Sequence, residues 1–159
     1  MPAPKENARH ELDAPPWRRV ESTLVATARA IRNAYDRRFE SLGLNLSQAS
    51  LLAFLHESGP QSQTALARRL GVGRAAIGTL IDGLEDRGLV ERQPDPADRR
   101  VWLVQTTQAG KELADPIRES DTELRAQLRA GISREERQQL AQLLLRLQAN
   151  LDRVLADAG

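Results

Sequence analysis

The sequence predicts a mainly α-helical fold: a winged helix-turn-helix domain with a two-stranded wing, plus a helical dimerisation domain built from the N- and C-terminal helices. Two short apolar segments within 62–87 are separated by a glycine-rich turn, as in a helix-turn-helix. Two short β-prone runs, at 89–93 and 100–104, follow directly and predict a hairpin. Long apolar stripes at helical spacing occupy both ends of the chain.

Composition restricts the class of protein. Among 159 residues, 23 are basic and 22 are acidic, so any nucleic-acid contact must come from placed charges and not from bulk charge. No cysteine is present, which excludes disulfides and thiolate nucleophiles. No segment approaches the roughly 18 apolar residues that span a membrane, and residues 1–16 lack the apolar region of a signal peptide. We therefore expect a cytoplasmic protein with no membrane contact.

The N-terminal part is expected to begin with a flexible tail over 1–16, followed by a long helix over 17–42. Apolar residues recur in that helix at spacings of three and four, and Gly43 ends the pattern. Ser47 is expected to cap a second helix. A Gly-Pro pair at 59–60 ends this second helix.

The two helices within 62–87 have the residues that a helix-turn-helix needs. Ser62 can cap the first helix, and Ala67 is the small residue expected at the crossing. Gly71, four residues later, makes the turn. Three apolar residues are expected to lock the second helix at its angle: Val72, Ile77 and Leu80. An ordinary αα-hairpin with a glycine turn is the alternative.

The loop of the predicted hairpin lies within RQPDPADRRVWL, residues 92–103. Arg99 and Arg100 stand at its descending edge, where a guanidinium group suits the electronegative minor groove of DNA. Asp95 and Asp98 are expected to shape the turn, and Asp98 to hold an arginine through a charge-assisted hydrogen bond. A solvated tip with mixed charges is the alternative, but next to the helix pair we expect a DNA contact.

The C-terminal region, 108–157, is expected to form a kinked helix and then a leucine-rich helix. Thr107 can cap the first of these, and Pro116 within its apolar pattern predicts a kink or a late start. Ser133 with Glu136 fits a capping box for the last helix. Because so small a domain gives the terminal helices little to pack against, we expect them to pair in a homodimer.

At this point the chain resembles a known family. Residues 66–113 resemble the MarR family of bacterial transcriptional regulators, most strongly at GLVERQPDPADRR (88–100) and again at TQAG (107–110). The resemblance implies a winged helix-turn-helix domain at about 47–106 between dimerisation helices. It also implies a homodimer that binds a pseudo-palindromic operator in double-stranded DNA, commonly a repressor released by a small-molecule effector.

The resemblance places DNA-binding residues on three segments. Those of the first helix of the pair fall on Ser62, Gln63 and Thr64. Those of the second helix fall on Gly73, Arg74, Ala75, Ala76, Gly78 and Thr79. Those of the wing fall on Asp98, Arg99 and Arg100. Many members of the family carry arginine where Thr79 and Gly83 stand here, so base readout is expected to depend on Arg74, Thr79, small apolar contacts and DNA shape.

An effector pocket is expected between the helical dimerisation region and the DNA-binding domain. Its candidate lining residues are four aromatic side chains and one histidine: Trp17, Tyr35, Phe39, Phe54 and His56. Ordinary core packing of these residues is the alternative. The chain has two histidines, too few for a histidine-rich zinc site, and no cofactor is expected.

No enzyme motif is visible. The chain lacks a glycine-rich phosphate loop after a strand, a Ser-His-acid arrangement and paired metal ligands. The sequence therefore predicts a DNA-binding regulator and not an enzyme. A winged-helix adaptor that binds other proteins is the alternative, because the second helix of the pair carries few cations.

Overall fold

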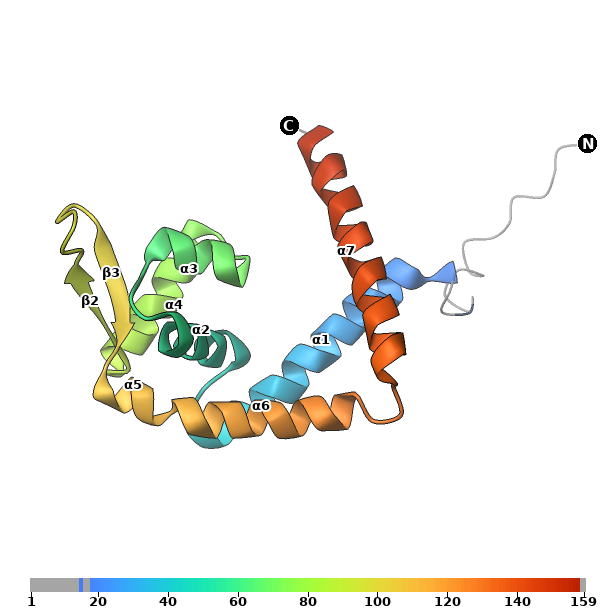
Figure 1. The fold of residues 1–159 in the computed structure, drawn as a ribbon, viewed down its shortest axis with the longest axis horizontal. Helices are drawn as coiled ribbons and strands as arrows, with labels where there is room; N and C mark the ends of the chain where they lie inside the picture. Colours follow the sequence, from blue (N-terminus) through green and yellow to red (C-terminus); the bar gives the residue numbers. More distant parts are fainter. Residues whose placement is uncertain (1–14, 16–17, 158–159) are drawn as a thin grey trace, which may run out of the picture. The chain divides into compact units, whose positions relative to one another are not determined.

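The structure is a computed structural model that describes Pro15 and residues 18–157. It confirms the mainly α-helical class with a small antiparallel sheet (Figure 1). The elements are α1 (Val20–Phe39), the short 3-10 helix η3 (Glu40–Leu42), α2 (Leu46–Ser58), β1 (Gln61–Ser62), α3 (Gln63–Leu70), α4 (Arg74–Asp86), β2 (Val90–Pro94), β3 (Trp102–Thr106), α5 (Gln108–Glu112), α6 (Ala114–Leu128) and α7 (Arg134–Asp157). None of the helices in these residues is long and apolar enough to cross a membrane.

Helix α2 begins with a capping box that differs from the predicted cap. The Asn45 side chain accepts the backbone N–H of Gln48 at 2.9 Å, and the Gln48 side chain accepts the backbone N–H of Asn45 at 3.0 Å. The prediction that Ser47 caps this helix is therefore wrong. Asparagine caps as well as serine does, and its reciprocal bond with Gln48 satisfies two backbone donors, so the helix starts before Ser47.

The predicted hairpin is present, shifted slightly toward the C-terminus, and it belongs to a three-stranded sheet in the order β1-β3-β2. The sequence did not predict β1, a two-residue strand that pairs antiparallel with β3. In the β2–β3 pair, Arg92 lies opposite Val104 and Pro94 opposite Trp102. Directly opposed residues share a face of the sheet, so these four side chains are on one side of the hairpin.

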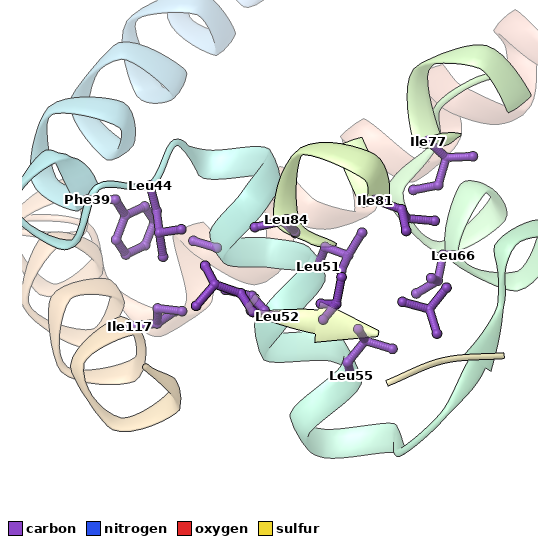
Figure 2. Close-up of a cluster of buried hydrophobic side chains, with 14 of the residues drawn as sticks. Phe39, Leu44, Leu51, Leu52, Leu55, Leu66, Ile77, Ile81, Leu84 and Ile117 are labelled. Atoms are coloured by element: carbon purple, nitrogen blue, oxygen red, sulfur yellow. The ribbon is translucent and has the colours of Figure 1, made fainter. Parts of the chain in front are cut away.

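The core of the winged helix joins α2, α3 and α4. Figure 2 shows its buried side chains, which include Leu51, Leu66 and Ile77. Of the three residues expected to lock α4, Ile77 is fully buried, but Leu80 is half-buried and Val72 is exposed. Ile81 and Leu84 are buried in their place, because with Ile77 they form one stripe at spacings of four and three. Of the predicted locking set, Ile77 is in the core, Leu80 packs against the core while half-buried, and Val72 is exposed.

The region after the sheet is a broken helix. The Thr107 hydroxyl accepts a hydrogen bond from the backbone N–H of Gly110 at 3.2 Å, so Thr107 caps α5 as predicted. The break falls at Leu113, between α5 and α6, and Pro116 lies in the first turn of α6, which agrees with the predicted late start.

Helix α7 begins with the predicted capping box. The N–H of Ser133 donates to the Glu136 carboxylate at 2.7 Å, and the N–H of Glu136 donates to the Ser133 hydroxyl oxygen at 3.1 Å. Hydrogen bonds from the backbone and side chain of Ser133 lower the pKa of Glu136 below its ordinary value. The carboxylate therefore stays charged beside the positive end of the helix dipole.

The chain divides into two compact units, with the boundary inside α6 between Asp121 and Thr122. The first unit contains the winged helix and α1, and the second contains the end of α6 and α7. The division into a dimerisation region (17–42 and 108–157) and a DNA-binding domain (47–106) stays a prediction.

Candidate nucleic-acid interface

The start of α3 and the turn after it form the support of the helix-turn-helix. The Ser62 hydroxyl accepts the N–H of Ala65 at 3.2 Å and so caps α3, as predicted. Gly71 makes the turn with a φ of 65°, in the left-handed region that favours glycine. Thr64 is exposed at the first turn of α3, where its hydroxyl is free to face solvent or a phosphate.

Gln63 closely approaches α4, the second helix of the helix-turn-helix pair. A Cβ added to Gly78 would lie 3.3 Å from the Gln63 side-chain nitrogen, so the glycine leaves room for that amide. Gly78 is half-buried, and its lack of a side chain leaves space for the Gln63 amide. The predicted positions Gln63 and Gly78 are therefore neighbours across the α3–α4 pair.

Helix α4 begins at Arg74, with its first residues exposed. Gly73 is the N-cap residue and supplies no side-chain hydrogen bond, so the first N–H groups of α4 have no side-chain cap. Such groups attract phosphate oxygens. Ala75 and Thr79 are also exposed, and the Thr79 hydroxyl donates to the Ala75 carbonyl at 3.1 Å. This hydroxyl oxygen can still accept a hydrogen bond from the amino group of a base.

The wing tip is a turn built by its aspartates. The N–H of Ala97 donates to the Asp95 carboxylate at 2.8 Å, and the N–H of Arg100 donates to the Asp98 carboxylate at 3.0 Å. The predicted role of the aspartates in shaping the turn is therefore confirmed. Asp98 holds Arg100 through its backbone N–H and not through its guanidinium group. Arg99 and Arg100 are both exposed.

Arg92, on strand β2 of the wing, connects the wing to helix α4. Its guanidinium group donates to Asp82 at 2.6 Å and to Glu85, both on α4. The backbone N–H of Arg92 also donates to Glu85, at 3.3 Å. Partial burial alone would lower the pKa of Arg92, but the hydrogen bonds and charges of Asp82 and Glu85 raise it overall. Arg92 therefore stays charged, and we call these three residues the wing clasp.

The sequence did not predict the wing clasp. Asp82 and Glu85 are three residues apart, a spacing that places them on one side of a helix. That spacing was the available signal, but their partner lies beyond a turn whose geometry the sequence does not specify. The sequence alone therefore does not connect these two acids with an arginine of the wing.

A cleft of about 670 Å³ opens between the start of α2 and the side of α4, with Arg32 of α1 at its edge. Apolar side chains such as Leu70 and Leu80 line it, together with Ser47 and Ser50. Two of the predicted recognition-helix positions, Ala76 and Thr79, also line this cleft.

The residues predicted to line an effector pocket are not gathered in this cleft. Phe39 is buried in the core, and Tyr35 stacks on it with ring centres 5.8 Å apart and donates to Asp121 at 2.9 Å. Phe54 lies under the guanidinium group of Arg69, at 5.3 Å. The two remaining positions differ again: His56 lines a separate polar cleft of about 460 Å³, and Trp17 lies outside the described residues.

Comparisons with known proteins agree with this geometry. The MarR family model matches residues 42–101, which span α2 through the wing. The chain is 26% identical to the uncharacterized HTH-type transcriptional regulator YdgJ of Bacillus subtilis over 137 residues, 86% of this chain and 84% of that protein.

Solved structures show the same fold. The MepR–DNA complex of S. aureus matches with a TM-score of 0.76 and 21% identity, over 83% of this chain and 97% of that chain. CouR from Rhodococcus jostii, bound to p-coumaroyl-CoA, matches with a TM-score of 0.72 and 27% identity, over 79% of this chain and 88% of that chain. Members of this family are transcriptional regulators and not enzymes, in agreement with the sequence analysis. In sequence over residues 42–101 and in fold over most of its length, the chain is similar to MarR-family transcriptional regulators.

Proposed function

We propose that this protein is a cytoplasmic repressor that binds a pseudo-palindromic DNA operator as a homodimer and leaves it when a small molecule binds. One observation carries the DNA-reading part: three adjoining elements present exposed groups suited to DNA. These are the uncapped first turn of α4 with Arg74, the start of α3 with Thr64, and the wing tip with Arg99. The wing clasp joins the wing to α4, and the Gln63 side chain lies next to Gly78 of α4.

Helix α7 supports the homodimer. It is 24 residues long, and none of its residues is buried in the single chain. Its apolar side chains recur at spacings of three and four, which makes one stripe that a twin helix could cover. The exposed members of this stripe include Leu140, Leu143, Leu151, Val154 and Leu155.

The cleft beside α4 supports the response to an effector. Its lining is largely apolar, and the guanidinium group of Arg32 at its edge donates to the Ser47 hydroxyl at 3.3 Å. A small molecule with an apolar body and an anionic group would fit this chemistry. Because Ala76 and Thr79 line the cleft, such a molecule would touch α4 directly. It releases DNA only if it binds the free protein more tightly than the DNA-bound one.

Substitution of a wing arginine tests the proposal, once a bound duplex has been selected from a random pool. Arg99→Ala removes one cation that would neutralise phosphate or enter the minor groove. We expect weaker binding and a salt dependence, the slope of log K against log salt, that is lower by about one. Fluorescence anisotropy of the labelled duplex over a range of salt concentrations measures both quantities.

A matched control is Arg134→Ala, which removes the same charge from the exposed start of α7. This variant should keep the wild-type slope. If Arg99→Ala and Arg134→Ala behave alike, the wing does not contact DNA. If the wild type binds no duplex at all, an adaptor that binds proteins becomes the better description.

A further inference from the structure

Trp102 is an exposed aromatic side chain on the wing. It is 55% exposed, and within the described part of the chain no other aromatic side chain is classed as exposed. An aromatic ring of this size has a large apolar area, so removing it from water stabilises a complex substantially. Trp102 is the first residue of β3, two residues after Arg100.

The strand register shows which way the ring faces. Trp102 lies opposite Pro94, and the next pair on the same face is Val104 opposite Arg92. Val104 is buried, and Arg92 reaches Asp82 on α4. This side of the hairpin, which we call the inner face, therefore packs against the recognition helix at its base. Trp102 and Pro94 continue the inner face toward the tip, past the end of the core.

The surroundings of the ring indicate its partner. Arg99 and Arg100 are both exposed and come three and two residues before Trp102 in the same loop. The nearby carboxylates of Asp95 and Asp98 are directed to backbone N–H groups within the turn. An apolar ring next to guanidinium groups matches a nucleic-acid groove, in which apolar sugar and base surfaces alternate with phosphates.

We propose that Trp102, backed by Pro94, is an apolar DNA contact of the wing. Its ring packs on the sugars or base edges of the groove that Arg99 approaches, so the wing binds through surface contact as well as charge. This inference rests on the proposed function, because it takes DNA as the partner of the wing. It adds a contact that neutralises no phosphate, which gives it a signature different from that of an arginine.

Intrinsic fluorescence tests the contact directly. The chain has two tryptophans, so Trp17→Phe leaves Trp102 as the single reporter. On addition of the selected duplex, the emission of Trp102 should be quenched or shifted, and its quenching by acrylamide should fall. Anisotropy of labelled DNA confirms in the same sample that binding occurs. Unchanged emission from a protein that has bound its DNA would overturn the proposal.

Affinity provides the second test. Trp102→Ala should weaken binding by about tenfold, within the range for the loss of one stacking contact, and should leave the salt slope unchanged. Trp102→Phe should recover most of the affinity. Val101→Ala is the matched control, because Val101 is adjacent to Trp102, 36% exposed and lies just before β3.

The outcomes separate the two proposals. If the wild type binds no duplex, the proposed function fails. If the wild type binds and Trp102→Ala binds equally well, only the contact by Trp102 is refuted. Thermal unfolding of each variant shows whether the fold is kept, and should Trp102→Ala unfold, the fluorescence of the Trp17→Phe protein decides.

Discussion

Gly110 lets the helix after the wing pack closely against the backbone at the start of the hairpin, because it has no Cβ. A Cβ added to Gly110 would lie 2.1 Å from the carbonyl oxygen of Leu89 and 3.1 Å from its carbonyl carbon. That carbonyl also accepts the N–H of Thr107 at 3.1 Å, so it cannot turn away without losing a hydrogen bond. The start of α5 and the start of the hairpin therefore touch through their backbones.

Gly110→Ala should destabilise the protein by about 1–3 kcal/mol, because overpacking against a backbone atom exceeds the gain of up to about 1 kcal/mol in helix propensity. Urea unfolding measures the change. Gly83→Ala is the matched control: this helical glycine has no atom within 4 Å of an added Cβ, so the same substitution should be neutral or stabilising. An alanine at 110 that leaves stability unchanged would contradict the close contact.

Residue-level predictions from the sequence succeeded where the deciding pattern was local. Ser62, Thr107 and Ser133 cap helices because each stands three residues before the N–H that it accepts. The prediction for Ser47 failed because Asn45 is an equally good cap two residues earlier. Local sequence shows that a helix starts near a good capping residue. Where two good capping residues lie close together, the sequence does not show which of them the helix uses.

At the scale of elements, the wing clasp joins β2 to α4. Arg92→Met keeps the long apolar stem but removes the charge, so two acids on the recognition helix lose their counter-charge. Their side chains are partly exposed, 64% for Asp82 and 39% for Glu85, so we expect a stability loss of at most about 1 kcal/mol. DNA affinity should fall more than this loss explains, because unpaired carboxylates then repel the phosphates.

The double variant Arg92→Met with Asp82→Asn separates these causes. It removes one repelling carboxylate without restoring the clasp, so it should recover part of the lost affinity at low salt. Thermal unfolding and DNA anisotropy are compared for both variants. Wild-type affinity in the single variant would show that the unpaired carboxylates of α4 do not repel the bound DNA.

The elements themselves were largely predictable, because helical periodicity and β-prone runs are properties of the sequence. Strand β1 was not, since two residues are too few to show any periodicity. The clasp and the cleft beside α4 depend on how elements pack after folding: Arg92 reaches Asp82 across the turn between α4 and β2, and the cleft joins residues from Arg32 to Gly83. The described aromatic residues predicted for the effector pocket, Tyr35, Phe39 and Phe54, do not line this cleft, because their places also depend on how the elements pack.

At the scale of the whole molecule, the proposed homodimer depends on the apolar stripe of α7. Leu151 is 50% exposed in the single chain, and Leu151→Glu would place a charge in an interface made by this stripe. We expect this variant to sediment as a monomer and to lose tight operator binding. Gln142→Glu adds the same charge on the opposite side of α7 and should stay dimeric. A dimeric Leu151→Glu protein would place the interface elsewhere.

Selection of duplexes from a random pool, followed by measurement of the mass of the complex, tests the central claim most directly. Two winged helices that read one duplex should enrich a palindromic sequence with half-sites about 10 base pairs apart, bound by two chains per duplex. A single chain per duplex, or a pool in which no sequence is enriched, would contradict it.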